Sequence, residues 1–281
     1  MNNKFTGQDF SFVRRLFYDY SGIMLGEDKA YFAEARLSEL VRQEGLASLG
    51  ALLLLLRKQV AGGSLQLQAC ELLLIAETSF FRDIHPFEVL KSHVIPALIE
   101  KNSHRREINL WCAACASGQE PFSLAMLMDY HFPILRTWKV NITATDISHR
   151  VLERAKSGCF NQMEVNRGLP AAMLVRYFSR QGMKWCINDT IRQMVSFEHL
   201  NLMDPHFMFK NMDVIFIRNI LIYFDLPSKQ VVLKKIRQCL HPEGYVFLGS
   251  AEGTVYVDQG FTPIYQGKTI YYRLNESTVD S

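Results

Sequence analysis

The sequence predicts an α/β protein in which a small all-helical domain precedes a larger domain built on a mostly parallel sheet. From Gln8 to about Glu77, apolar residues recur at helical spacing. After Glu107 the pattern changes to short apolar runs that alternate with amphipathic helices, which is typical of a parallel sheet flanked by helices. The length of 281 residues also favours one main domain with a smaller companion.

The N-terminal region predicts several short helices. Apolar residues recur at intervals of three and four over residues 10–17 and again over residues 31–40. Glycines at positions 22, 45, 62 and 63 interrupt this pattern and predict the helix ends. Composition leaves two roles open for this domain, a docking module for a substrate protein or a cap that stabilises the second domain.

Four apolar runs in the second domain predict buried strands, each followed by turn residues and a helical pattern. The alternation breaks between Phe160 and Leu202, where two strand-like pieces at 183–187 and 193–199 stand close together. They predict a small antiparallel β insertion instead of another crossover helix. The predicted strands are 108–113, 140–145, 212–217 and 245–248. The predicted divisions are a helical domain at 1–77, a linker and domain start at 78–106, the main domain at 107–274 with its insertion at about 160–200, and a polar tail at 275–281.

Charge and hydropathy exclude several classes of function. The 31 basic and 28 acidic residues are interspersed, which argues against a nucleic-acid partner. The longest uncharged apolar run, at 52–56, is too short to cross a bilayer and ends at Arg57, so we expect no membrane insertion. No charged segment followed by an apolar one opens the sequence, so we expect a cytoplasmic protein.

The six cysteines are scattered, which favours free thiols in a reducing cytosol over a disulfide framework. Only Cys112 and Cys115 form a C-x-x-C pair, and no second pair of ligands follows them. Buried structural thiols therefore fit better than a zinc or redox site, and we expect no metal.

The first predicted strand of the main domain runs into a turn of small residues and then a helix. Such a turn at a helix N-terminus lets a ligand approach the backbone closely. Pro121 suits the start of the helix because its missing N–H has no partner to lose there. The turn has one glycine, Gly118, and lacks G-x-G-x-x-G, so a dinucleotide pyrophosphate site fits poorly. A cofactor turn and ordinary close packing both remain open.

Asp146 ends the second predicted strand of the main domain. A carboxylate at the carboxyl end of a parallel strand can accept hydrogen bonds from both hydroxyls of a ribose. The alternative is that Asp146 only caps the helix that starts near His149. Glu120 has the same ambiguity, because an acid at a helix N-terminus also favours the helix dipole.

Five segments together resemble the successive signatures of the bacterial chemotaxis receptor methyltransferases, the CheR family. Their order and spacing match as well. The end of the chain, G-Y-V-F-L-G-S-A-E at 244–252, is similar to the family's closing strand, and Gly22-Ile23, Leu25 and Arg36-Leu37 are similar to its helical domain. The resemblance implies a Rossmann-like class I methyltransferase domain. The five segments are E-T-S-F-F-R-D at 77–83, W-C-A-A-C-A-S-G-Q-E-P-F-S at 111–123, A-T-D-I-S at 144–148, N-L at 201–202 and I-R-N-I-L-I-Y-F-D at 217–225.

The resemblance also implies a site for S-adenosyl-L-methionine. In such enzymes the acid that matches Asp146 holds the ribose, the Asn-Leu pair flanks the adenine, and the other polar residues surround the methionine end. The chain departs from the family at Ala76, where an asparagine is frequent, and this puts one hydrogen bond in doubt. The implied cofactor residues are Thr78, Arg82, Glu120, Asp146, Asn201, Leu202, Arg218 and Asn219.

The implied reaction is methyl transfer to glutamates of chemotaxis receptors, which gives methyl esters and S-adenosyl-L-homocysteine. A glutamate with a pKa near 4.3 is already ionised at neutral pH, so no general base is required. Arg82 and Tyr223 are the implied catalytic residues that position the acceptor. The alternatives are that Arg82 pairs only with the cofactor and that Tyr223 only packs. A methyltransferase for another nucleophile and a non-catalytic S-adenosylmethionine-binding regulator also remain open.

The expected partner is the cytoplasmic helical domain of a chemoreceptor, bound by a monomer of this chain. Family members that tether to a receptor's C-terminal pentapeptide resemble one another in having a longer, glycine-containing loop in the insertion. Here the corresponding residues, 177–185, pass from a helix to a strand with very few loop residues between them. We therefore expect no tethering to the receptor's C-terminal pentapeptide. Docking would then use the helical domain, where Lys29, Arg36 and Arg42 fall near one helical face and could meet acidic helices. An ordinary solvated face is the alternative.

Overall fold

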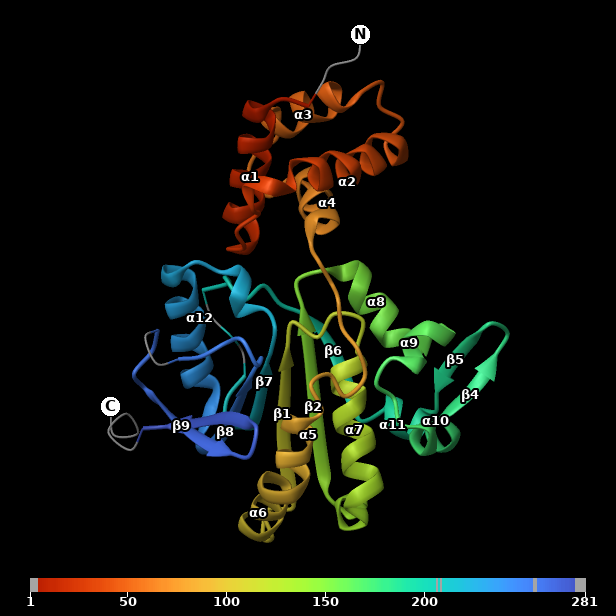
Figure 1. Ribbon diagram of the computed structural model, residues 1–281, viewed down its shortest axis with the longest axis vertical. Helices are drawn as coiled ribbons and strands as arrows, with labels where there is room; N and C mark the ends of the chain where they lie inside the picture. Colours follow the sequence, from red (N-terminus) through yellow and green to blue (C-terminus); the bar gives the residue numbers. More distant parts are fainter. Residues whose placement is uncertain (1–4, 206, 208, 255–256, 276–281) are drawn as a thin grey trace. The chain divides into compact units, whose positions relative to one another are not determined.

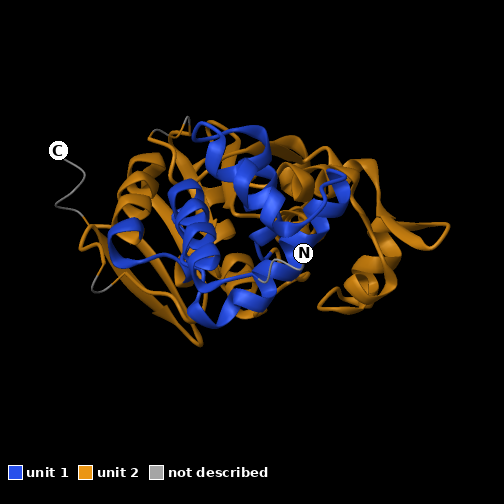
Figure 2. Cartoon of the chain, turned by 90° about the horizontal axis from the view of Figure 1, so that it is seen from above, with its two compact units in different colours: residues 1–75, 223–228 blue, residues 76–222, 229–281 orange. Residues whose placement is uncertain are grey.

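The computed structural model describes residues 5–205, 207, 209–254 and 257–275, so the predicted tail lies outside the described residues except for Asn275. The chain divides into two compact units, which Figure 1 traces along the sequence and Figure 2 colours separately. One comprises Met1–Ile75 with Tyr223–Ser228, and the other comprises Ala76–Ile222 with Lys229–Ser281.

The first unit is mainly helical, which confirms the predicted helical domain. Its first helix begins at a capping box between Thr6 and Asp9 and ends at Gly22, whose φ of 70° requires the left-handed conformation that glycine adopts easily. The helices bury a shared apolar core that includes Phe17 and Leu37. The elements are α1 Gly7–Ser21, the 3-10 turn η1 Glu27–Lys29, α2 Ala30–Gln43, α3 Leu49–Lys58 and α4 Ser64–Leu73.

The segment Tyr223–Ser228 joins this unit although it lies far along the chain. The Met24 amide donates to the Tyr223 carbonyl at 2.9 Å, and the Tyr18 hydroxyl donates to the Asp225 carboxylate at 2.7 Å. These contacts tie the segment to α1 and to the loop that follows it.

The second unit is organised around a sheet whose described part has seven strands. Strands β6, β2, β1, β7 and β8 run parallel, and β10 pairs antiparallel with both β8 and β9. The order turns at β1, which has β2 on one side and β7 on the other. In such sheets the ligand crevice lies outside the carboxyl ends of the strands at this point. In spatial order the strands are β6 Val195–His199, β2 Lys139–Asp146, β1 Glu107–Ala113, β7 Met212–Ile217, β8 Leu240–Leu248, β10 Thr269–Leu274 and β9 Phe261–Gln266.

The four predicted strands are confirmed as β1, β2, β7 and β8, because buried parallel strands appear in a sequence as continuous apolar runs.

Helices α7 and α8 pack on β2 and β6, and α5 packs on β10. The helices of this unit are α5 His85–Val89, the π-helical turn η2 Leu90–Val94, α6 Ile95–Lys101, α7 Gln119–His131, α8 His149–Ser157, α9 Gln162–Asn166, α10 Ala171–Tyr177, α11 Asp189–Arg192 and most of α12 Leu226–Cys239, with 3-10 turns η3 Pro133–Thr137 and η4 Leu221–Tyr223.

The antiparallel insertion is present, but its strand pairing differs from the prediction. The hairpin joins β4 Phe178–Gln181 to β5 Lys184–Ile187, and β3 Cys159–Phe160 completes the small sheet. The predicted second strand, 193–199, instead pairs in parallel with β2 in the main sheet. An edge strand of a parallel sheet and a hairpin strand share the same short alternating pattern, so the sequence did not distinguish them.

The expectation of six free thiols is wrong for one pair. A disulfide joins Cys159 of β3 to Cys186 of β5, which are directly opposite each other in the strand register. The two residues stand 27 positions apart, and only the strand pairing brings them together. The other four cysteines are buried free thiols. Among the described residues, every helix is too short or too polar to traverse a lipid bilayer.

Candidate cofactor and active site

Asp146 ends β2, and the residue is only 9% exposed. One carboxylate oxygen accepts a hydrogen bond from the Ala116 amide at 2.9 Å, and the other accepts from the Ser148 amide at 3.0 Å. Burial raises the pKa of Asp146, and these two backbone donors oppose that rise. The cap of α8 is Ser148, whose hydroxyl accepts from the Val151 amide at 3.4 Å. The capping alternative therefore does not account for Asp146.

The turn between β1 and α7 is built for close approach of a ligand. Ala114 and Ala116 have positive φ angles of 57° and 47°, and Gly118 has 89°. A side chain at Gly118 would come within 3.0 Å of the Ala155 Cβ. The Ala116 bond to Asp146 fixes this turn against the end of β2, so the small-residue turn and the acid form one surface.

Arg218 directly follows β7, and its side chain is 1% exposed. It donates to Glu120 at 2.7 Å, to Asp83 at 2.8 Å and to the Arg82 carbonyl at 2.9 Å. Burial raises the pKa of Glu120, and the charge of Arg218 opposes the rise. The Arg218 Nε is buried and has no hydrogen-bond partner among the described residues. Arg218 thus joins the start of α7 to the segment that carries Arg82.

The segment around Arg82 has an unusual backbone. Phe81, Asp83 and Ile84 have positive φ angles of 47°, 64° and 22°, although none of them is glycine. The Phe81 amide donates to the Ser123 hydroxyl of α7 at 3.0 Å, and Arg82 donates to the Glu77 carbonyl at 3.1 Å. Strained backbone of this kind is found preferentially at functional sites.

Thr78 is half-buried in the stretch without regular secondary structure just before this segment. Ala76, where the family often has asparagine, is exposed two residues earlier.

The loop with Asn201 and Leu202 folds on itself. The Asn201 side chain accepts from the Met203 amide at 2.9 Å, and the Asn201 amide donates to Asp204 at 3.2 Å. The buried amine of Lys235 in α12 donates to the carbonyls of Leu202 at 2.5 Å and Asp204 at 2.7 Å. The sequence analysis did not choose Lys235, because its role depends on contacts between segments far apart in the chain.

Glu252 holds the turns after β7 and β8. Its carboxylate accepts from the amides of Gly249 at 2.6 Å, Asn219 at 2.8 Å and Ile222 at 3.2 Å. Asn219 has a φ of 58°, and Gly249 leaves no room for a side chain beside the Asn219 amide. Glu252 stands in the closing segment of the resemblance, but no role was assigned to it.

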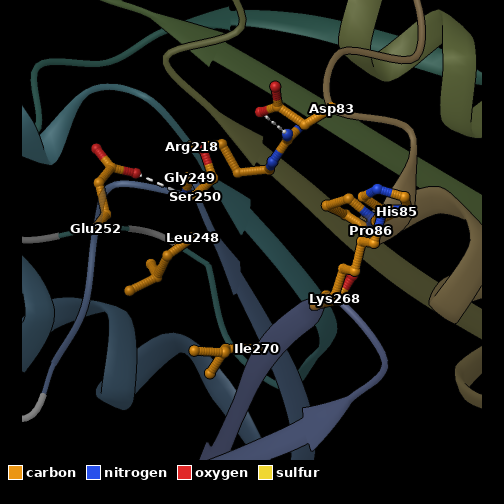
Figure 3. A pocket seen from close by; sticks show the side chains of 11 residues that line it. Asp83, His85, Pro86, Arg218, Leu248, Gly249, Ser250, Glu252, Lys268 and Ile270 are labelled. Carbon is orange, nitrogen blue, oxygen red and sulfur yellow. Dashed lines mark hydrogen bonds and ion pairs between the residues drawn. The ribbon is translucent and has the colours of Figure 1, made fainter.

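A pocket lies beside Arg218 (Figure 3). Of the predicted cofactor residues, only Arg218 lines it, so it adjoins the predicted cofactor residues without coinciding with them. Its polar lining includes Asp83, His85 and Lys268, none of which the sequence analysis chose. Asp83 ends the family segment at 77–83, which was the available signal for it, but no role was assigned to it.

Eight of the nine predicted site residues belong to the second unit. Tyr223 belongs to the helical unit, so its predicted cooperation with Arg82 stays a prediction. The described residues contain no group of three or more His, Cys, Asp or Glu side chains placed to share a metal ion.

The residues present fit a nucleoside cofactor with a charged amino-acid end. The Asp146 carboxylate retains acceptor capacity beyond its backbone donors, which suits ribose hydroxyls. The partnerless Arg218 Nε is a buried donor, and such a group is costly unless it finds an acceptor. Gly118 keeps the surface of the turn free of a side chain.

A doubly wound sheet with a buried acid beside the turn after its central strand defines the class of α/β domains that bind nucleotide-type cofactors. Comparison with known proteins identifies the family within this class. Residues 76–269 match "CheR methyltransferase, SAM binding domain", where SAM is S-adenosylmethionine, and residues 8–71 match "CheR methyltransferase, all-alpha domain". The chain belongs to the CheR methyltransferase family, and its cofactor is S-adenosylmethionine.

Curated relatives match over nearly their whole length. Chemotaxis protein methyltransferase 1 of Pseudomonas aeruginosa is 38% identical over 94% of this chain and 97% of its own. Chemotaxis protein methyltransferase Cher2 of Pseudomonas putida is 40% identical over 87% of this chain and 90% of its own. The chemotaxis protein methyltransferase of Vibrio parahaemolyticus is 36% identical over 95% and 97%, respectively.

Proposed function

We propose that this protein transfers the methyl group of S-adenosylmethionine to glutamate side chains of chemotaxis receptors in the cytoplasm, as a protein-glutamate O-methyltransferase. The observation that supports this most is the match of both family domains, in order, across a chain whose relatives are chemotaxis protein methyltransferases. The products would be glutamate methyl esters and S-adenosylhomocysteine.

The roles proposed for the site residues follow from their contacts. Asp146 would accept hydrogen bonds from the ribose hydroxyls, and the loop of Asn201 and Leu202 would flank the adenine. Arg218 and Glu120 would face the methionine end, together with Thr78 and Asn219. When bound, the cofactor supplies a methyl group on a sulfonium, which is open to displacement by a carboxylate.

The chain's own contribution to the chemistry would be alignment. An ionised glutamate needs no base, so the site must hold the acceptor oxygen in line with the bond that breaks. Good alignment of this kind can lower a barrier by several kcal/mol, up to the order of 7–11. Arg82, half-buried beside Glu77, and Tyr223 are the residues proposed to position the acceptor.

Methyl transfer from radiolabelled S-adenosylmethionine to a receptor cytoplasmic fragment tests the proposal. Base-labile label on the receptor supports a glutamate ester. Base-stable label would indicate another nucleophile, and cofactor binding without transfer would indicate a non-catalytic regulator. Arg82→Lys serves as a matched variant, because it keeps the charge but loses the planar guanidinium.

The proposed mode of docking uses the helical unit of a monomer and does not depend on the receptor's C-terminal pentapeptide. In the insertion, Gln181 pairs with Lys184, so only Gly182 and Met183 connect β4 to β5, and little surface stands beside the edge strand β4. Lys29, Arg36 and Arg42 are exposed in the helical unit, where they could meet acidic receptor helices.

Titration with the C-terminal pentapeptide of the organism's own receptors tests this docking mode. Absence of saturable binding is expected, whereas saturation at micromolar concentration would refute it. Replacing all three basic residues by glutamine should raise the KM for the receptor without changing cofactor affinity. Sedimentation of the chain at assay concentration checks the monomer.

A further inference from the structure

Two histidines form a stacked pair beside the proposed ribose acid. The imidazole rings of His149 and His199 are parallel within 6°, with centroids 4.0 Å apart. The His199 Nε2 lies 2.9 Å from the Ile147 carbonyl oxygen. Because a carbonyl can only accept, the Nε2 carries the hydrogen and donates it. Neither histidine belongs to the cofactor residues implied by the resemblance.

This pair is fixed to the end of β2 by the sheet itself. His199 ends β6 and stands opposite Asp146 in the parallel register. The Leu200 amide, one residue further along, donates to the Asp146 carbonyl at 3.0 Å. His199 therefore reaches Ile147 from a strand end that is already anchored, and its ring meets the ring of His149 at the start of α8.

The bond from His199 is made within the short connection that aims the Asp146 carboxylate. That connection, residues 146–148, contains the Ser148 amide that holds one carboxylate oxygen, and the Ala116 amide holds the other. The Ile147 carbonyl belongs to the same peptide unit as the Ser148 amide. Rotation of this peptide would move the donor away from Asp146, and the His199 bond opposes that rotation.

We propose that His199 is a positioning residue for cofactor binding. Its hydrogen bond holds the Ile147–Ser148 peptide in the orientation that keeps Asp146 facing the ribose hydroxyls, and the stacked ring of His149 supports the ring of His199. The proposal rests on the proposed assignment of Asp146 to the ribose. His199 acts through that acid and does not touch the cofactor itself.

The test is calorimetric titration of the full chain with S-adenosylhomocysteine and with its 2′-deoxyribose analogue. His199→Ala should weaken binding of S-adenosylhomocysteine by up to about tenfold, because the exposed bond to Ile147 acts on the ligand only by positioning Asp146, and should weaken binding of the deoxy analogue by less than about threefold. His199→Gln should recover most of the affinity, because its side-chain amide can donate to the same carbonyl. His149→Ala should cause a smaller loss with the same dependence on the 2′-hydroxyl.

His104→Ala is the matched control, because His104 is exposed in the turn before β1 and should leave both affinities unchanged. Equal losses for the two ligands, no loss, or no recovery by glutamine would overturn the proposal. If His199→Ala does not fold, the glutamine and His149 variants decide the question by the same comparison. Failure of the unsubstituted chain to bind S-adenosylhomocysteine would overturn the proposed function instead, and failure to prefer it over the deoxy analogue would overturn the role of Asp146.

Discussion

Both ends of the main sheet bury acidic side chains, but the partners of these acids differ in kind. At the amino end of β7, the 1% exposed side chain of Asp213 accepts from Arg105, from the Asn109 amide at 2.9 Å and from the Asn102 side chain at 3.4 Å. At the carboxyl end, Asp146 accepts hydrogen bonds from the Ala116 and Ser148 amides, and the buried Nε of Arg218 has no partner in the part of the chain that the structure describes.

The difference indicates two uses for buried polar groups in one sheet. Asp213 accepts from three fixed donors in the chain itself, so its contribution is to stability. At the carboxyl end, the Asp146 carboxylate can accept further hydrogen bonds and the Arg218 Nε can donate one. Such unused capacity is expected where a ligand completes the hydrogen bonding. Substitutions at the two ends should therefore separate stability from cofactor affinity.

The largest effect is expected at the amino end. Asp213→Ala leaves the Asn109 amide and Arg105 without their acceptor, so the free energy of unfolding should fall by about 3 kcal/mol. Guanidinium unfolding measures this loss. The affinity of the folded variant for S-adenosylhomocysteine should stay within about twofold of the original. A parallel loss of affinity would contradict the separation of the two ends.

The next effect concerns the carboxyl end. Asp146→Ala should weaken S-adenosylmethionine binding by about 1.5–3 kcal/mol, as is typical of hydrogen bonds to a charged group, while the protein stays folded. Calorimetry measures the affinity, and a thermal melt checks the fold. An unchanged affinity would remove Asp146 from the cofactor site. Asp213→Ala should lower stability and preserve cofactor affinity, whereas Asp146→Ala should lower cofactor affinity while the protein stays folded.

The third prediction extends the comparison to the helical unit. Tyr223→Phe should lower turnover by about tenfold and change cofactor affinity little, since Tyr223 is proposed to position the acceptor. Steady-state kinetics with a receptor fragment and calorimetry measure the two quantities. Tyr18→Phe is a useful control, because it removes the bond to Asp225 in the same unit without touching Tyr223. An equal loss of cofactor binding in Tyr223→Phe would place that residue beside the cofactor.

The pattern of apolar residues along each strand explains which features the sequence predicted. Buried parallel strands such as β2 and β7 were predicted to within one residue at either end, because each is a continuous apolar run. The acid that ends β2 was found for the same reason. The strand at Val195–His199 was assigned to the wrong sheet, because its alternating pattern is the same in either place.

Features that depend on contacts between distant segments could not be predicted. The Cys159–Cys186 disulfide follows from strand register, and the stacking of His149 on His199 follows from the neighbouring positions of β2 and β6. The role of Glu252 depends on three amides that two separate turns bring to one carboxylate. None of these contacts leaves a periodic pattern in the sequence.

The smallest effect is expected in the pH dependence of cofactor binding. Burial raises the pKa of Asp146 above its ordinary value of 3.8, against the opposing backbone bonds. The folded state therefore binds this proton more tightly than the unfolded chain does. Between pH 3.8 and the raised pKa, the contribution of Asp146 to stability decreases as the pH rises. Affinity for the cofactor should change in the opposite direction, because a protonated carboxyl accepts hydroxyl hydrogen bonds more weakly than a carboxylate.

Calorimetry with S-adenosylhomocysteine at pH values decreasing from about pH 7.5 should then show an affinity that falls as Asp146 becomes protonated. The effect is expected to be small because backbone hydrogen bonds from Ser148, Ala116 and Ile147 and the charge of His199 oppose the rise in the pKa of Asp146. Asp146→Ala should bind weakly but with little dependence on pH over this range, and Asp213→Ala should keep the original dependence. A constant affinity in the unsubstituted chain, or the same trend in Asp146→Ala, would assign the pH dependence to groups other than the ribose acid.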